Sequence, residues 1–431
     1  KVGSICLKKG ETTLIPKFND YTQRFEMESK TTIEPGLDAV TDALNKVGNP
    51  HLNLQFIHVA GTNGKGSTIS MMNAMLQAHG VKTACFYSPC FMDVHDQIQL
   101  NGQYISSQQL GDLFIRAKEA GLSGLLTDFE LLTVLAFMAF EQFQPQIVLL
   151  ETGMGGRFDS TNVIQPLISV IPSIALEHEQ FLGNSIEEVA FHKAGIIKKG
   201  IPVVIGPLVE EAEGVLVTEA LKLKSPLWKV NQDFSLDKGT FESSVRPQIR
   251  NIVVPLPGSH QIDNAALAIR TVLYAMEKLK LTINEDLIRI GLSHTFIPGR
   301  FEKITDNLYF DGAHNPASAR ALVNTVKEVF PNTPVHFYVG MIKGKDAKSI
   351  LRIFEEISSN FTFVDFEDVR SMPSSALLEF SESALVNVTK EPLENIVKTI
   401  SETHVTIVTG SLYLLSELRL KALNMYNIDH R

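Results

Sequence analysis

The chain has 431 residues, of which 44% are hydrophobic and 20% charged, an ordinary composition for a globular protein of two or three domains. Its net charge of -9 argues against a general nucleic-acid binder, because phosphate backbones require clustered Lys and Arg; small anions remain acceptable ligands for a locally positive pocket. No apolar run reaches bilayer-spanning length, and Cys6, Cys85 and Cys90 suggest no disulfide framework. We therefore expect a cytoplasmic protein with reduced thiols and no membrane association.

Apolar periodicity predicts alternating strands and helices in the first two thirds of the chain. Strands are expected at 54–59, 83–87, 146–150, 167–171 and 202–205, and helices at 37–47, 67–79, 107–121, 128–143, 186–194 and 263–279. Residues 88–106 indicate a long loop or short hairpin, and residues 225–255 a small antiparallel patch. This alternation predicts an α/β fold with a doubly wound, mostly parallel sheet.

The pattern restarts after Pro298-Gly299, which we interpret as a linker. Strands are expected at 308–310, 335–339, 361–364 and 405–408, and helices near 317–329, 346–357, 391–401 and 412–423. The predicted domains are thus 1–296, with a P-loop-type sheet, and 297–431, a smaller Rossmann-like α/β domain.

The strongest signal is the segment 58–68, His-Val-Ala-Gly-Thr-Asn-Gly-Lys-Gly-Ser-Thr, between a predicted strand and a predicted helix. In such a turn, backbone N–H groups and the helix N-terminus face anionic oxygens. Lys65 would neutralise outer phosphates, and the hydroxyl of Ser67 or Thr68 would reach magnesium or phosphate. The strict Walker pattern is not met, because Val59 replaces its first glycine and Gly66 separates the lysine from the hydroxyl. The segment nevertheless predicts a nucleoside triphosphate site.

Three further residues of the first domain follow or end predicted elements, and each has an ordinary alternative. Glu151 ends a strand, where it is either a magnesium ligand or simply solvated. His178 follows another strand and, without context, is a hydrogen-bonded loop histidine. Lys193 near a helix C-terminus would by itself only complement the helix dipole.

The second domain adds Arg300, just past the linker, and the run 311–316, Asp-Gly-Ala-His-Asn-Pro. An Asn-Pro helix start explains the Gly, Asn and Pro of this run but not its Asp and His. Arg300 is either a surface residue or a phosphate ligand. The phenylalanines near 129, 137, 140 and 143 have helical spacing and favour a core position over a stacking surface.

Together these motifs resemble the folylpolyglutamate synthase/dihydrofolate synthase family of the Mur ligase superfamily. The resemblance runs from about Pro35 to Leu418. It rests on residues 61–67, 88–89, 128–130, 151–162, 178, 193–197, 258–261, 264, 298–301, 311–316 and 410–413. The Gly-Lys-Gly-Ser form favours the folate branch over the cell-wall ligases.

The resemblance implies an ATP-dependent, ADP-forming amide ligase of folate and one-carbon metabolism. ATP would phosphorylate the carboxylate of a reduced folate or of dihydropteroate, and the amine of L-glutamate would attack the acyl phosphate. The implied ATP-binding residues are Gly64, Lys65, Gly66, Ser67, Asn264, Arg300 and Asp311. The implied ligands of two Mg²⁺ ions are Ser88, Glu151, His178 and Lys193, the lysine in its carbamylated form. The implied pterin-binding residues are Phe129, Glu130, Phe158, Asp159 and Ser160. Lys65, Lys193 and His314 would be catalytic, with His314 orienting the glutamate.

The sequence departs from the family pattern after Ser88-Pro89. Cys90-Phe91 replaces the usual His-Leu, and His95-Asp96-Gln97-Ile98 replaces Asn-Glu-Arg-Ile, so the substrate loop lacks an arginine. His192 also stands where a glutamate is usual.

Four functions are therefore considered. The first is folylpolyglutamate synthase, with or without dihydrofolate synthase activity. The alternatives are a monofunctional dihydrofolate synthase, an amide ligase for a non-folate acid, and a nucleotide-binding regulator without catalysis. The regulator is disfavoured by the retained set Lys65, Glu151, His178, Lys193 and Arg300. A monomer is expected.

Overall fold

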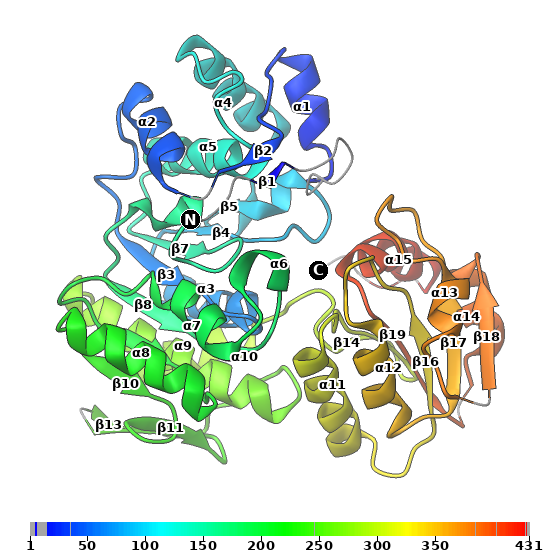
Figure 1. Cartoon of the computed structure of the whole chain (residues 1–431). Coiled ribbons are helices and arrows are strands. Elements are labelled where there is room, and N and C mark those ends of the chain that lie inside the picture. The colour runs from blue at the N-terminus through cyan, green and yellow to red at the C-terminus, as the bar shows by residue number, and fades with distance from the viewer. Residues whose placement is uncertain are drawn as a thin grey trace. The chain divides into compact units, whose positions relative to one another are not determined.

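Figure 1 shows the computed structural model, which describes residues 5–6, 15–34, 36–244, 246–383, 385–401, 403–426 and 428. Pro35, where the resemblance begins, lies outside these residues, as does the side chain of Cys6. The chain forms two compact units: unit 1 is Lys1–Pro255 with Ile262–Thr295, and unit 2 is Leu256–Gln261 with Phe296–Arg431.

The main sheet of unit 1 has the strand order β10-β9-β8-β3-β7-β4-β5-β6 among the described residues. The bounds are β3 (Phe56–Val59), β4 (Thr83–Phe86), β5 (Ile98–Leu100), β6 (Gln103–Tyr104), β7 (Ile147–Glu151), β8 (Ile168–Ile171), β9 (Val203–Ile205) and β10 (Leu227–Lys229). Strands β10 to β4 are parallel, and β5 and β6 form an antiparallel hairpin at one edge. The predicted mostly parallel α/β sheet is confirmed.

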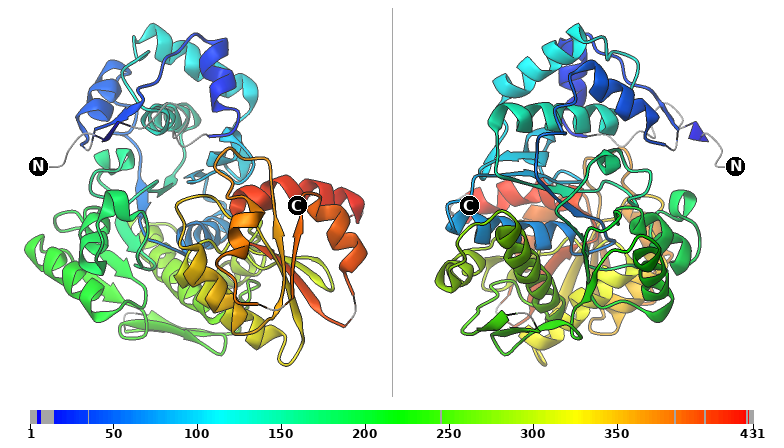
Figure 2. Two further views of the ribbon diagram at one scale, coloured as in Figure 1. Left: turned by 45° about the vertical axis from the view of Figure 1, so that its right-hand side comes forward. Right: turned by 90° about the vertical axis from the view of Figure 1, so that its left-hand side faces the viewer.

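Helices cover both faces of this sheet, as the two views of Figure 2 show. Their bounds are α1 (Phe18–Arg24), α2 (Asp38–Lys46), α3 (Lys65–Ala78), α4 (Ser107–Glu119), α5 (Asp128–Phe143), α6 (Glu179–Leu182), α7 (Ile186–Ala194), α8 (Glu210–Lys222), α9 (Ser259–Lys278) and α10 (Glu285–Ser293). Successive side chains of a strand point to opposite faces, so buried strands supply apolar groups to two cores. On one face, Phe56 of β3 meets Phe137 of α5 with ring centroids 5.7 Å apart. Helices α3 and α10 pack closely together, since a Cβ on Gly291 would lie 2.5 Å from Met75 Cα.

Two predictions about unit 1 were wrong in detail. Helix α3 begins at Lys65 rather than Ser67, because Gly64, with φ 82°, serves as its N-cap. Residues Leu227–Lys229 belong to the main sheet as parallel β10; only β11 (Phe234–Asp237), β12 (Thr240–Ser243) and β13 (Arg246–Ile249) form the antiparallel patch. Pairing with β9 decides this, and pairing is a long-range contact that local composition does not reveal.

Unit 2 contains a second sheet with the order β14-β15-β19-β16-β17-β18, parallel except for β14. The strands are β14 (Glu302–Thr305), β15 (Leu308–Phe310), β16 (Val335–Val339), β17 (Asn360–Val364), β18 (Leu385–Thr389) and β19 (Val405–Thr409). The helices are α11 (Pro316–Val329), α12 (Ala347–Glu355), α13 (Ser374–Leu378), α14 (Pro392–Thr399) and α15 (Leu412–Met425).

Neighbouring residues of β16 show that the unit 2 sheet is covered on both faces. Phe337 stacks on Phe354 of α12, with ring centroids 4.7 Å apart. The hydroxyl of Tyr338 donates to Asn395 Oδ1 of α14 at 2.6 Å. The two side chains point to opposite faces, so α12 and α14 cover different sides of the sheet.

Two short elements complete the description. Strands β1 (Ile5–Cys6) and β2 (Thr32–Ile33) form an antiparallel pair. None of the helices in the described part of the chain is long and apolar enough to cross a membrane.

Candidate active site

The phosphate loop of unit 1 connects β3 to α3 and is braced from the segment that follows β8. The Asn63 N–H donates to Ser173 Oγ at 2.9 Å, and Thr62 Oγ1 donates to the Ala175 carbonyl at 3.0 Å. Lys65 turns back over the loop, and its Nζ donates to the Gly61 carbonyl at 2.9 Å. The loop is therefore held in shape from outside, with its lysine at the first position of α3.

Position 64 requires glycine for two reasons, its backbone conformation and the closeness of Asn264. Its φ of 82° lies in the left-handed region, and a Cβ there would lie 2.6 Å from Asn264 Oδ1. The structure thus places Asn264, on α9, against the phosphate loop.

We expect Gly64→Ala to weaken nucleotide binding by at least 10-fold, because the methyl group must displace Asn264 or distort the loop. The left-handed conformation adds a destabilisation of about 1–2 kcal/mol. Isothermal titration with ADP and thermal unfolding measure the two effects. Gly80→Ala provides a matched control, since Gly80 also has a positive φ of 72° but nothing lies within 4 Å of its Cβ position. Equal ADP affinity in the two variants would contradict this account.

Glu151 ends β7 directly beside the phosphate loop. It pairs in register with Val59, the last residue of β3. Its Oε1 lies 3.8 Å from Lys65 Nζ, and its Oε2 accepts a hydrogen bond from the Ser88 N–H at 3.3 Å. A Cβ on Gly66 would lie 3.9 Å from the same Oε2. The structure therefore brings Ser88, which follows β4, together with Glu151 of β7 and with Lys65 and Gly66 of α3.

Lys193 is completely buried near the end of α7, and its charge is balanced by Glu177. Lys193 Nζ lies 2.5 Å from Glu177 Oε1, and the lysine side chain is 1% exposed. Burial lowers the pKa of Lys193 to about 8, although the Glu177 carboxylate opposes this effect. Burial acts to raise the pKa of Glu177, but the charges of Lys193 and Lys65 outweigh it and lower that pKa to about 2.

Glu177 is the functional candidate that sequence reasoning missed. It lies in the segment after β8, immediately before His178, and the signal available was an acid following a buried strand. Its pairing with Lys193, sixteen residues later, is visible only in the fold. Strands β8, β3 and β7 are neighbours, so Glu177, Lys65 and Glu151 all follow or end strands at one sheet edge.

His178 has a left-handed backbone, with φ 48°, and is exposed at the start of α6. Within the described residues, no three His, Cys, Asp or Glu side chains gather as a ready metal site. Magnesium usually takes only one or two carboxylates and completes its shell with phosphate oxygens and water. Glu151, and the hydroxyl of Ser88, whose backbone N–H donates to Glu151, are oxygen donors of the required kind, whereas Lys193 as an ammonium is not.

The predicted pterin-binding residues have mixed surroundings. The ring of Phe129 occupies the space beside Gly153, where a Cβ would lie 2.4 Å from Phe129 Cζ, and Phe158 is 42% exposed. Glu130 closes a capping box with Thr127 at 2.8 Å, and Ser160 Oγ lies 2.8 Å from Thr133 Oγ1. Asp159 accepts hydrogen bonds from the Met154 N–H and from Thr161. Glu130, Asp159 and Ser160 thus make hydrogen bonds to neighbouring residues, whereas the ring of Phe158 is partly open to solvent.

In unit 2, Arg300, Asp311 and His314 lie around Gly312. A Cβ on Gly312 would lie 2.4 Å from Arg300 Nη1. Asp311 accepts hydrogen bonds from the Phe301 and Ala313 N–H groups, each at 2.9 Å, and burial raises its pKa despite the Arg300 charge. His314 Nδ1 lies 2.8 Å from the Gly312 carbonyl, which only accepts, so Nδ1 carries the proton.

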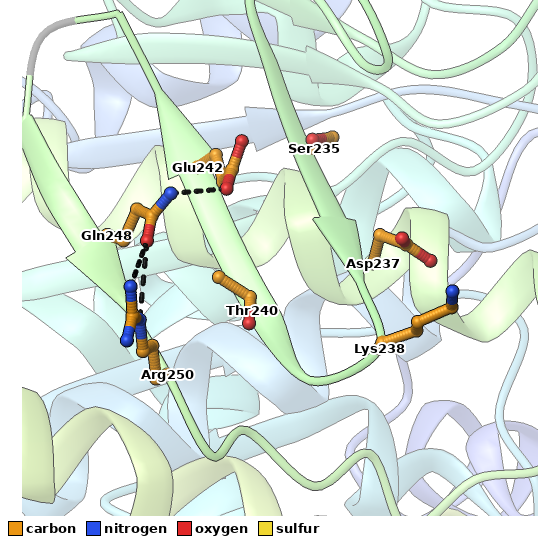
Figure 3. Close-up of a pocket in the computed structure, with 7 residues that line it drawn as sticks. All are labelled: Ser235, Asp237, Lys238, Thr240, Glu242, Gln248 and Arg250. Atoms are coloured by element: carbon orange, nitrogen blue, oxygen red, sulfur yellow. Dashed lines mark hydrogen bonds between the residues drawn. The ribbon is translucent and has the colours of Figure 1, made fainter.

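A separate hollow of about 610 Å³ lies over the polar face of β11–β13, as Figure 3 shows. Its lining residues are Ser235, Asp237, Lys238, Thr240, Glu242, Gln248 and Arg250. Gln248 bridges Glu242 and Arg250 by hydrogen bonds. None of these residues belongs to the phosphate loop or to the Glu151 and Lys193 cluster.

The fold and the phosphate site define an ATP-dependent ligase of the Mur type. The family profile of the Mur ligase middle domain matches residues 59–272, and that of the C-terminal domain of dihydrofolate synthetase matches residues 300–422. The chain is 33% identical to the dihydrofolate synthase/folylpolyglutamate synthase of Bacillus subtilis, over 90% of this chain and 95% of the relative. It is 33% identical to the folylpolyglutamate synthase of Lacticaseibacillus casei, over 87% and 92% of the two chains.

A solved E. coli structure, FolC in complex with DHPP and ADP, has a TM-score of 0.85 and 25% sequence identity, with 95% of this chain and 98% of that chain covered. The chain belongs to the dihydrofolate synthase/folylpolyglutamate synthase family. The family resemblance inferred from the sequence motifs is confirmed.

Proposed function

We propose that this ligase joins L-glutamate to the carboxylate of a reduced folate, and that it also acts on dihydropteroate. The observation that carries the proposal is the cluster of Lys65, Glu151, Glu177 and Lys193 at one edge of the unit 1 sheet, in a chain that matches a bifunctional relative over nine tenths of its length. The ligands DHPP and ADP of the E. coli relative fit the same reaction.

The proposed reaction brings the negatively charged acceptor carboxylate to the negatively charged phosphates of ATP, so positive groups must offset this charge. An oxygen of the acceptor carboxylate attacks the γ-phosphorus of ATP; a P–O bond forms, the bond to the β,γ-bridging oxygen breaks, and ADP leaves. The glutamate amine then attacks the acyl carbon, an amide bond forms, phosphate leaves and the amine loses a proton. Both anions of the first step repel each other, so positive groups at the phosphates lower its barrier. Lys65 and Arg300 would supply this charge.

The roles that we propose for the individual residues are those expected from the sequence. Gly64, Lys65, Gly66 and Ser67 bind the triphosphate, with Asn264, Arg300 and Asp311 completing the nucleotide site. Phe129 and Phe158 contact the pterin, with Glu130, Asp159 and Ser160 shaping that region. His314 orients the incoming glutamate. Domain roles, an ATP-binding part at 1–296 and a C-terminal part at 297–431, a monomeric state and a cytoplasmic location remain predictions.

Magnesium would be held by the predicted ligands Glu151, Ser88 and His178 and would supply charge neutralisation at the phosphates. The residues fit this role because a buried carboxylate oxygen and a hydroxyl are the hard oxygen donors that Mg²⁺ prefers. A second ion requires an anion at Lys193, which a carbamate on Nζ would provide. Only the neutral amine reacts with CO₂, and a pKa of about 8 makes that form accessible near neutral pH.

A paired assay tests the proposed function. ADP release is measured with L-glutamate plus tetrahydrofolate and, separately, with L-glutamate plus dihydropteroate. Turnover of both acceptors is the expected result. Turnover of dihydropteroate alone would identify a monofunctional dihydrofolate synthase. The match of residues 300–422 to the C-terminal domain of dihydrofolate synthetase favours this alternative. No turnover of either acceptor would favour a ligase for a non-folate acid.

A further inference from the structure

The connection between β4 and β5 carries Ser88 and is closed on itself. The Tyr87 N–H donates to the Gln97 carbonyl at 2.9 Å, and Gln97 Nε2 donates to the Tyr87 carbonyl at 3.0 Å. Between them, the buried carboxylate of Asp96 accepts hydrogen bonds from the Phe91 and Met92 N–H groups. We call residues 88–97 the Ser88 loop. Hydrogen bonds within residues 87–97 therefore fix the base and the interior of this loop.

The Ser88 loop is also tied to the start of α1 by four side chains, which we call the α1 clamp. Lys17 Nζ lies 2.6 Å from Asp93 Oδ2, and Asp93 Oδ1 lies 2.7 Å from His95 Nδ1. His95 Nε2 lies 2.8 Å from the Tyr21 hydroxyl. One backbone bond, from the Val94 N–H to the Pro16 carbonyl at 3.1 Å, runs beside the clamp. The His95 ring is therefore fixed at both nitrogens.

Charge supports the clamp. Burial acts to raise the pKa of the Asp93 carboxyl, but the bonds from Lys17 and His95 outweigh it and hold that pKa below its usual range. The Lys17 pKa is raised, chiefly by its hydrogen bond to Asp93. Both groups thus stay ionised at neutral pH, and the clamp contains a permanent ion pair.

Helix α1 gives the clamp a firm base. A seven-residue helix is not stable by itself, so its position depends on packing. Phe18 is fully buried, and its ring centroid lies 5.5 Å from that of Phe114 on α4. Tyr21 stacks on the same Phe114 ring at 5.4 Å. Helix α1 accordingly lies against α4, as Figure 2 also shows.

From this chain of contacts we propose that Tyr21 and His95 are positioning residues, which hold the Ser88 loop in place for the acceptor substrate. The Ser88 N–H donates to Glu151 Oε2 beside Lys65 of the phosphate loop, and in the proposed reaction the acceptor carboxylate has to reach the γ-phosphate there. The proposal rests on the proposed function for the identity of the acceptor. The phosphate loop is braced independently, from residues 173–175, so loss of the clamp should leave the binding of ADP without magnesium nearly unchanged.

The test uses Tyr21→Phe and His95→Gln in the full-length protein. Tyr21→Phe removes only the hydroxyl and keeps the ring on Phe114, so folding is preserved. Lys118→Met is the matched control, since it breaks another ion pair to α4, with Glu26 at 2.8 Å, that does not touch the Ser88 loop. Amide hydrogen exchange over residues 88–97 is measured together with kcat and KM for dihydropteroate or tetrahydrofolate, and ADP binding is measured by isothermal titration without magnesium.

We expect exchange in the Ser88 loop to accelerate at least 10-fold in both clamp variants and not in the control. We also expect kcat/KM for the acceptor to fall about 10-fold, because small displacements of positioning groups have large effects on rate, while the affinity for ADP without magnesium changes less than 2-fold. Unchanged exchange overturns the proposal, and so does faster exchange with unchanged acceptor kinetics, since the contact would then be structural only. Loss of magnesium-free ADP binding in parallel with acceptor kinetics also overturns it. If the wild-type enzyme is inactive with both acceptors, the proposed function and the acceptor role are both refuted. The exchange data then still show whether Tyr21 and His95 hold the Ser88 loop in place.

Discussion

Replacing Lys193 by arginine is expected to lower kcat by at least 10³-fold, even though the positive charge is kept. Lys193 is buried against Glu177 and close enough to Lys65 for their charges to interact. A lysine acting as a cation would tolerate arginine, whereas a carbamylated lysine is an anion that helps to hold magnesium. Arginine cannot form the carbamate, because its guanidinium stays protonated. Its fixed charge would also repel the metal, which is a loss of several kcal/mol of transition-state stabilisation.

Lys193→Ala should lose activity to a similar extent and regain part of it in acetate or formate, whose carboxylate replaces the missing anion. Activity of the wild type should also increase with bicarbonate as the pH rises through about 8, where the buried amine loses its proton. Lys199→Arg serves as the control, because Lys199 is exposed and lies just beyond the same helix. An active Lys193→Arg variant, together with a wild-type mass that shows no CO₂ adduct, would remove the carbamate from the mechanism.

Replacing Glu151 by glutamine is expected to reduce kcat by about 10²–10³-fold, the range seen when one group that stabilises a charged transition state is removed. The amide keeps nearly the same shape and still accepts a hydrogen bond from the Ser88 N–H, so the melting temperature should change little. It lacks the negative charge that would hold magnesium beside Lys65.

Steady-state kinetics at several magnesium concentrations, with thermal unfolding, measure both effects. The magnesium concentration for half-maximal rate should rise in Glu151→Gln. Glu119→Gln, at an exposed position on α4, is the control for a lost carboxylate. Normal melting with normal activity in Glu151→Gln would exclude Glu151 from the mechanism.

The sequence by itself determined the features that depend on short segments. A glycine-rich turn between an apolar strand and a helix identifies the phosphate loop, since phosphate binding uses consecutive backbone N–H groups. The position of Glu151 beside the phosphate loop was predictable, because residues at the carboxyl ends of parallel strands meet at one edge of a sheet. Alternating apolar runs were enough to predict α/β sheets in both parts of the chain, because strand and helix periods differ.

Only the tertiary structure decided which distant groups meet. The ion pair of Glu177 with Lys193 depends on how α7 packs beside β8, and the low pKa of Lys193 depends on burial, which no local pattern reveals. The assignment of Leu227–Lys229 to the main sheet required its pairing with β9. The α1 clamp joins Tyr21 to His95, 74 residues away, through a helix too short to be stable alone. In each case the deciding term is a long-range contact, whose energy exists only after the chain has folded.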